Sequence, residues 1–259
     1  MKYIRVTLAI LICFFLFAGC SSNSQHHNKE NVSITISAAA SLSDALVEIK
    51  EEFMKKHTEI NVILNFGGSG SLQQQIKQGA PVDVYFSAAE KPFAELLDKN
   101  LIYQENQSVV IGNSLVLISP KDRTLDSLDS LLDEDINTVA IGTPESVPAG
   151  MYAKESMISK GIWDELKDKL VMAKDVRQVL TYVETGNVGA GFVYKTEAID
   201  SNKVQIVMDI PSDLHDPIVY PAGVVRSTKN KEEAVLFYEY LKSPESIEIF
   251  NKYGFLTLE

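Results

Sequence analysis

Short apolar runs alternate with amphipathic stretches along most of this chain of 259 residues. The apolar runs are rich in valine and isoleucine, and the stretches between them repeat their apolar residues with a helical period. We therefore expect strands at residues 33–38, 60–66, 83–87, 114–119, 138–142, 170–173, 189–193, 204–208 and 217–226. Helices are expected at 42–56, 71–78, 91–99, 149–160, 176–185, 195–199, 230–241 and 244–252. This alternation indicates βα units, so the predicted fold class is α/β, with mixed sheets flanked by helices.

The βα units fall into two groups, at residues 33–99 and 138–208. Two apolar segments, "NSLVLISP" and "DPIVYPAGVV", lie between and after these groups, and we interpret them as antiparallel crossover strands between two lobes. The predicted first lobe comprises residues 32–116 and 220–259, and the second comprises 117–219. The alternative is one continuous sheet.

The N-terminal segment has the features of a secretory signal. Residues 1–19 carry two positive charges and then an apolar run that is too short for a membrane span. The run ends in "FAGC", which resembles the lipobox of bacterial lipoproteins, so Cys20 is predicted to be lipidated. Residues 20–31 are polar and are predicted to be a flexible tether. The protein would then be lipid-anchored on the extracytoplasmic face of the cell membrane. The alternative is an ordinary cleaved signal with a chance cysteine.

Cysteine and charge restrict the possible chemistry of the mature chain. Cys13 lies within the predicted signal peptide, so no free cysteine would remain for a disulfide, a nucleophile or a metal site. The pair His26 and His27 has no third ligand nearby, and a solvated tether is preferred to a metal site. Removal of the signal takes away two basic residues. It leaves 22 basic and 35 acidic residues, which gives a net charge of −13. This charge argues against nucleic acid and anionic lipid as partners.

Two of the predicted strands end in small hydroxyl and glycine residues directly before a helix. They read "ISAAASLSD" from residue 36 and "NFGGSGSLQQQIKQG" from residue 65. Ser41 and Ser43 flank the start of one helix, and Ser69 and Ser71 flank the start of the other. Serine at such positions commonly caps a helix. Alternatively, the unpaired amides and the positive ends of the helix dipoles form an anion site at the carboxyl ends of parallel strands.

The second half of the chain repeats this arrangement. "GTPESVPAGMYAKES" runs from a strand through Pro148 into a helix and exposes the amides of Ala149 and Gly150. "AKDVRQVLTYVE" places Asp175 as a cap before a helix that starts near Val176. Four such turns, two in each predicted lobe, predict an anion held between the lobes. The glycines of the second turn would let backbone come close to this ligand; they are Gly67, Gly68 and Gly70.

Seven segments together point to one family of transport proteins. They are "AAASLSDAL", "GSGSLQQQIKQGAPVDVYFSA", "GNSLVLISP", "VPAGMYAKESM", "KDVRQVLTYVETGNVGAGFVYKTEA", "YPAGVV" and "FYEYLKSPESIEIFNKYGF". From about residue 34 to its end the chain resembles the molybdate-binding proteins of bacterial molybdate ABC transporters. The resemblance implies a two-lobed, type II periplasmic-binding fold, a monomer that closes its interlobe cleft over a tetrahedral oxyanion and passes it to a permease. The implied ligand contacts are Ser41, Ser69, Ala149, Val176 and Tyr194, with Ser71 as an alternative to Ser69.

The chemistry of molybdate agrees with this set of residues. Molybdate at neutral pH is a fully deprotonated dianion that only accepts hydrogen bonds, so its site should hold donors and no carboxylate acceptor. Three hydroxyls and four amides provide about seven donors, each worth roughly 1.5–3 kcal/mol toward a charged group. Molybdenum would therefore bind as the oxyanion only, with no separate cofactor. Arg177 is expected to have a surface or hinge role, because the resemblance assigns the contact at this turn to the backbone of Val176.

Other ligands and an enzyme are the competing hypotheses. Sulfate is also a tetrahedral dianion that only accepts hydrogen bonds, and tungstate is nearly the same size as molybdate. Phosphate would require an acceptor for its proton, and iron would require a pair of tyrosines or a histidine beside Tyr194. A hydrolase would require a histidine near Ser41 or Ser69, and none of the four turns contains one. The predicted function is thus oxyanion binding without catalysis.

Overall fold

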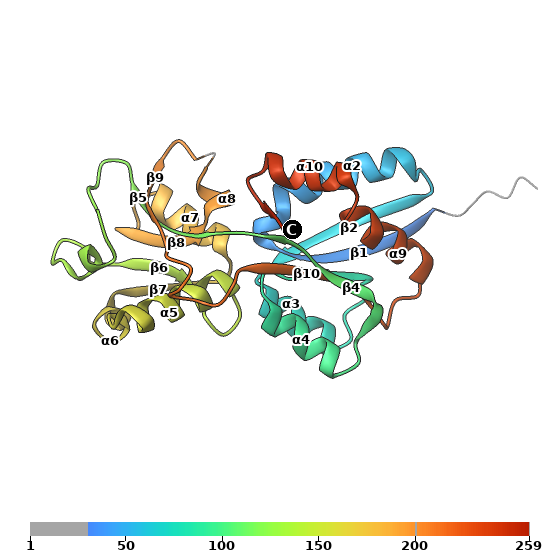
Figure 1. Cartoon of the computed structure of the whole chain (residues 1–259), viewed down its shortest axis with the longest axis horizontal. Coiled ribbons are helices and arrows are strands. Elements are labelled where there is room, and N and C mark those ends of the chain that lie inside the picture. The colour runs from blue at the N-terminus through green and yellow to red at the C-terminus, as the bar shows by residue number, and fades with distance from the viewer. Residues whose placement is uncertain (1–30, 200, 259) are drawn as a thin grey trace, which may run out of the picture. The chain divides into compact units, whose positions relative to one another are not determined.

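Six strands form the first of two sheets in the computed structural model, which describes residues 31–199 and 201–258 (Figure 1). The strand order is β11-β4-β10-β3-β1-β2. The bounds are β1 (Val32–Ala39), β2 (Ile60–Gly67), β3 (Val84–Phe86), β4 (Ile102–Gly112), β10 (Val219–Val225) and β11 (Leu256–Thr257). β1 pairs in parallel with β2 and β3, whereas β10 pairs antiparallel with β3 and β4. The strand β3, "VYF", is fully buried at the centre of the sheet, and its residues are of the aromatic and β-branched types that favour strands.

Helices cover both faces of this first sheet. In Figure 1, α2, α9 and α10 lie on one face, and α3 and α4 lie on the other. Apolar residues of α2 recur at helical spacing and are buried against the sheet, namely Ala45, Leu46, Ile49 and Phe53. The bounds are η1 (Ala40–Leu42), α2 (Ser43–Lys56), α3 (Ser69–Lys77), α4 (Glu90–Asp98), α9 (Lys231–Leu241) and α10 (Pro244–Lys252).

Five strands form the second sheet, in the order β7-β6-β8-β5-β9. β6 pairs in parallel with β7 and β8, and β5 pairs antiparallel with β8 and β9. The strands are β5 (Leu115–Pro120), β6 (Val139–Gly142), β7 (Leu170–Ala173), β8 (Ala190–Tyr194) and β9 (Val204–Asp209). The helices are η2 (Asp129–Leu132), α5 (Pro148–Lys160), α6 (Trp163–Leu166), η3 (Lys167–Lys169), α7 (Val176–Glu184) and α8 (Lys195–Ala198).

The chain crosses between the two sheets twice, as the sequence predicts. It leaves the first sheet after β4, builds the second, and returns through β10, so the predicted mixed α/β architecture with two lobes is confirmed. The two crossings run together, because Val219 pairs with Gly112 and the Asn113 amide donates to the Ile218 carbonyl at 3.2 Å. We call residues 113–114 and 218 the hinge.

The lobe boundaries differ from those predicted by a few residues. Leu115 and Val116 pair with β8 in the second sheet, so the first lobe ends before residue 115 and not after 116. Val219 already pairs with β4, so the return to the first lobe comes one residue earlier than predicted. The predicted signal peptide, and the predicted tether up to residue 30, lie outside the described residues.

The longest strand of the first sheet was not predicted. β4 reads "IYQENQSVVIG", and its polar centre is half-buried or exposed, so it lacks the regular alternation that marks a strand. It forms because β10 and β11 pair with it on either side. Within residues 31–199 and 201–258, the structure has no helix that is both long and apolar enough to span a membrane.

Candidate functional site

One small cavity between the lobes brings all five predicted ligand residues together. The cavity is narrow, with about 10 Å³ open to the centre of a water-sized sphere, and it is walled by the ends of strands and the starts of helices from both lobes. The predicted residues in its wall are Ser41, Ser69, Ala149, Val176 and Tyr194. No lysine or arginine stands among the described residues that line it. The wall therefore consists of backbone, hydroxyls and small apolar side chains, apart from Asp175.

The first lobe contributes two buried serines to the wall. Ser41 follows β1 within η1 and is 5% exposed, and Ser69 is the first residue of α3 and is fully buried. Neither hydroxyl caps its helix, because the N-cap positions are occupied by Ala39 and Gly68, which have no polar side chain. The Ser69 hydroxyl instead accepts a hydrogen bond from the Ala88 amide at 2.9 Å, so its own hydrogen remains available to a ligand.

The structure distinguishes Ser69 from the serine two residues later. Ser71 is exposed and does not line the cavity, and Ser43 donates to the Ala40 carbonyl at 2.8 Å. The helical geometry of α3 explains this difference, because residues two apart on a helix point in directions about 200° apart. Ser69 is thus the serine of this turn that borders the cavity.

The second lobe contributes the starts of two helices. Pro148 is the first residue of α5 and has no amide hydrogen, so Ala149 provides the first N–H of this helix. Val176 is the first residue of α7, and the Asp175 carboxylate caps this helix by accepting from the Gln178 amide at 2.8 Å. The first amides of a helix have no partner within it, and the helix dipole makes its N-terminus favourable for an anion.

Tyr194 completes the wall at the end of β8. Its side chain is buried, and its hydroxyl donates to the Ala88 carbonyl of the first lobe at 3.3 Å. Burial raises the pKa of Tyr194 well above its ordinary value, so the phenol stays protonated and remains a donor at neutral pH. Tyr194 thus makes a hydrogen bond that joins the two lobes beside the cavity.

The fold and the site can now be compared with those of known proteins. The family described as bacterial extracellular solute-binding protein matches residues 34–256. The chain belongs to this family.

Several relatives of this solute-binding protein are named for ABC transport or for molybdate binding. YvgL of Bacillus subtilis (strain 168), named as an ABC transporter substrate-binding lipoprotein, is 50% identical over 98% of both chains. The molybdate-binding protein ModA of Escherichia coli (strain K12) is 41% identical over 86% of this chain and 88% of its own. Among solved structures, the periplasmic molybdate-binding protein of Azotobacter vinelandii is 26% identical with a TM-score of 0.79, covering 87% of this chain and all of its own.

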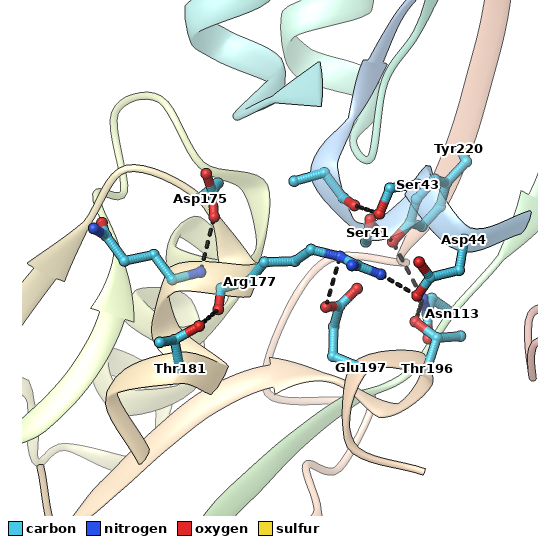
Figure 2. A network of polar contacts seen from close by, with 12 residues as sticks. Ser41, Ser43, Asp44, Asn113, Asp175, Arg177, Thr181, Thr196, Glu197 and Tyr220 are labelled. Atoms are coloured by element: carbon cyan, nitrogen blue, oxygen red, sulfur yellow. Dashed lines mark hydrogen bonds and ion pairs between the residues drawn. The ribbon is translucent and has the colours of Figure 1, made fainter. Parts of the chain in front are cut away.

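Three residues at the site of this solute-binding protein were missed by the sequence analysis. Ala88 provides both an amide for Ser69 and a carbonyl for Tyr194. Tyr220 and Asn113 form a buried network with Ser41, which Figure 2 shows beside the first lobe's turn. Tyr220 and Asn113 lie in the segments "YPAGVV" and "GNSLVLISP" that carry the family resemblance, but no spacing in the sequence indicates that they meet Ser41.

Two of the three predicted glycines have a further role that the sequence did not indicate. A Cβ atom added at Gly68 would lie 2.7 Å from the carbonyl oxygen of Ser146, and one at Gly70 would lie 2.8 Å from the Ser146 Cα. Ser146 belongs to the second lobe, and its carbonyl accepts a hydrogen bond from the Gly70 amide at 2.9 Å. These glycines therefore allow the backbones of the two lobes to touch, rather than only a backbone to approach a ligand.

Asp175 corrects the expectation that no carboxylate borders the site. The residue lines the cavity, but one of its oxygens is engaged by the Gln178 amide as the cap of α7. This carboxylate has a role unrelated to the ligand, because it satisfies a first-turn amide of α7. Among the described residues, no group of three or more His, Cys, Asp or Glu side chains is arranged to hold a metal cation.

Arg177 lies outside the cavity wall and joins the lobes. Its guanidinium forms an ion pair with Asp44 of α2, and its Nε lies 3.5 Å from Glu197 Oε2 of α8 (Figure 2). The Glu197 side chain is almost fully buried, and burial raises its pKa to about 7 although Arg177 acts in the opposite direction. The Arg177–Asp44 pair is exposed enough to be screened, so its contribution to lobe closure is small.

Proposed function

We propose that this protein binds molybdate outside the cell membrane and delivers it to an ABC permease for import. The observation that carries this proposal is the cavity between the lobes, whose wall holds five residues able to donate hydrogen bonds and no basic side chain among the described residues. The donors come from both lobes, so a bound ion would hold the lobes together. The names of the relatives YvgL and ModA, which refer to an ABC transporter and to molybdate, support the same ligand and partner.

The proposed donors are sufficient for tight binding of a dianion. They are the amides of Ser41, Ser69, Ala149 and Val176 and the hydroxyls of Ser41, Ser69 and Tyr194. The Tyr194 hydroxyl would exchange its 3.3 Å bond to the Ala88 carbonyl for one to the ion. At roughly 1.5–3 kcal/mol for each bond to a charged group, about seven donors provide a gross gain on the order of 10–20 kcal/mol. Dehydration of the ion and closure of the lobes oppose this gain, and a net value of about 12 kcal/mol corresponds to nanomolar affinity. No catalysis is required.

Calorimetric titration with molybdate, tungstate, sulfate and inorganic phosphate tests the proposed ligand. We expect molybdate and tungstate to bind with similar affinity. Sulfate is smaller and would leave donors of one lobe buried and unpaired, so it should bind roughly a hundredfold or more weakly. Phosphate should bind weakly because its proton finds few acceptors. Preferential binding of sulfate would show that the alternative ligand, sulfate, is the correct one. If none of the four ions binds, the proposal is refuted.

The lipid anchor is a second part of the proposed function. The segment "FAGC" and the polar residues behind it support lipidation at Cys20, and the relative YvgL is named as a lipoprotein. Metabolic labelling with a fatty acid should mark the wild-type protein and not the Cys20→Ser variant. Equal labelling of both proteins would contradict the anchor. The mature protein is expected to be a monomer, which size-exclusion chromatography with light scattering measures directly.

A further inference from the structure

A chain of buried hydrogen bonds runs from the hinge to the cavity (Figure 2). The Ser114 amide donates to Asn113 Oδ1 at 2.8 Å, and Asn113 Nδ2 donates to the Tyr220 hydroxyl at 3.2 Å. The Tyr220 hydroxyl lies 3.0 Å from the Ser41 hydroxyl, which borders the cavity. Asn113, Tyr220 and Ser41 are all at most 7% exposed. Water therefore has little access to these side chains.

The first bond of the chain determines the orientation of the Asn113 amide. A backbone N–H can only donate, so the Asn113 atom that faces the Ser114 amide must be the oxygen. The amide nitrogen then faces the other two partners, the Tyr220 hydroxyl at 3.2 Å and the Thr196 hydroxyl at 3.0 Å. Rotating the amide by 180° would place two donors against each other at Ser114. Both hydrogens of Asn113 Nδ2 are thus engaged.

The orientation of Asn113 favours one direction for the hydrogen bond between Tyr220 and Ser41, in which either hydroxyl could donate on distance alone. Tyr220 accepts from Asn113 and is fully buried, so its own hydrogen needs a protein acceptor, and the Ser41 oxygen at 3.0 Å provides one. Ser41 then accepts from Tyr220, and its hydrogen is directed away from Tyr220 toward the cavity. The Ser114 amide at the hinge thus influences, through Asn113 and Tyr220, where the hydrogen of the Ser41 hydroxyl points.

Ser69 shows the same pattern with a shorter chain. Its hydroxyl accepts directly from the Ala88 amide at 2.9 Å, so its hydrogen is also left for the cavity. Each of the two cavity serines therefore accepts from a donor whose direction is set by a backbone N–H. For Ser41 the backbone N–H is remote, and Asn113 and Tyr220 relay its effect.

We propose that Asn113 and Tyr220 are positioning residues that hold the Ser41 hydroxyl as a donor toward the bound ion. This inference rests on the proposed function and adds to it the reason for selecting ions that carry no proton. An ion such as hydrogen phosphate needs an acceptor, and a serine whose lone pair is already occupied by Tyr220 is a poor one. Molybdate and sulfate both lack a proton and benefit equally from the relay.

A double-mutant cycle on Asn113 and Tyr220 tests the relay. In Asn113→Asp, the carboxylate accepts from both the Ser114 amide and the Tyr220 hydroxyl, so Tyr220 must accept from Ser41 and the cavity loses a donor. We expect molybdate affinity to fall about a hundredfold, and to fall about tenfold in Tyr220→Phe. In the Tyr220→Phe background, Asn113→Asp should cost at most about tenfold, because only the added charge remains.

The controls separate the relay from a general loss of packing. Tyr238→Phe also removes a buried tyrosine hydroxyl that bonds a serine, Ser108 at 3.0 Å, but this pair does not line the cavity. It should bind molybdate as the wild type does. The affinity for inorganic phosphate relative to sulfate should rise severalfold in Tyr220→Phe, because Ser41 can then turn and accept. A purely structural defect would lower the affinities for phosphate and for sulfate by the same factor.

The outcomes distinguish the relay from the proposed function. If the losses in the two single variants simply multiply in the double variant, or if Tyr220→Phe binds like Tyr238→Phe, the relay is refuted while molybdate binding stands. If the wild type binds sulfate and not molybdate, the same cycle is measured with sulfate, and the relay can stand while the proposed ligand fails. If none of molybdate, tungstate, sulfate and phosphate binds, both are refuted.

Discussion

Ser69 and Ser71 show how much a single residue's place in a helix matters. Ser69 is buried in the cavity wall, and Ser71 is exposed on the same helix. Replacing Ser69 by alanine removes one hydroxyl donor to a charged ion, so molybdate affinity should fall roughly tenfold to a hundredfold. Ser71→Ala, the matched control, should bind as the wild type does. Calorimetry decides between them, and a larger loss in Ser71→Ala would reverse the assignment.

Glu197 makes the stability of the protein depend on pH. Burial raises its pKa from 4.5 to about 7 in the folded protein, so the folded state binds more protons than the unfolded state between these values. The free energy of unfolding should therefore fall as the pH rises through this interval, by about 3 kcal/mol in total. Glu197→Gln should remove most of this dependence. Thermal melts from pH 5 to 8 measure it, and parallel curves for the two proteins would contradict the prediction.

At the scale of elements, the start of α3 must touch the second lobe for the cavity to close. A methyl group at Gly70 would meet the Ser146 Cα at 2.8 Å, and a backbone atom cannot move aside as a flexible side chain can. Gly70→Ala should therefore hold the lobes apart and weaken molybdate binding by about a hundredfold, since donors of one lobe no longer reach the ion.

A glycine outside the lobe contact provides the control for this prediction. A methyl group at Gly189 would meet its nearest atom, the Thr138 carbonyl oxygen, at an ordinary 3.4 Å. Gly189→Ala should keep wild-type affinity, and both variants should melt within a few degrees of the wild type. Wild-type affinity in Gly70→Ala would show that lobe closure does not need this backbone contact.

At the scale of the whole molecule, binding should be accompanied by closure. The candidate ligand residues are divided between the lobes, and only the two hinge segments connect the sheets, so the lobes can move as units. Small-angle X-ray scattering should give a smaller radius of gyration with saturating molybdate than without it. An unchanged scattering profile would indicate that the site is already closed before the ion binds.

The acidic charge of the molecule does not exclude an anionic ligand. The predicted mature chain has a net charge of −13, but the charged side chains are screened by salt over about 8–10 Å, and the donors of the cavity would touch the ion directly. Local dipoles therefore outweigh the distant charges.

The sequence by itself determined most of the helices and strands, though not β4, together with the two crossover strands and the four turns, because each depends on local periodicity and local helix-end chemistry. It also indicated the five candidate residues, through motifs that are continuous in the chain. Only the tertiary structure decided that Ser69 and not Ser71 faces the cavity, that Gly68 and Gly70 contact the other lobe, and that Asn113 and Tyr220 support Ser41. These facts depend on contacts between residues as far apart as 41 and 220, and the packing of two sheets, rather than any pattern along the chain, brings such residues within hydrogen-bonding distance.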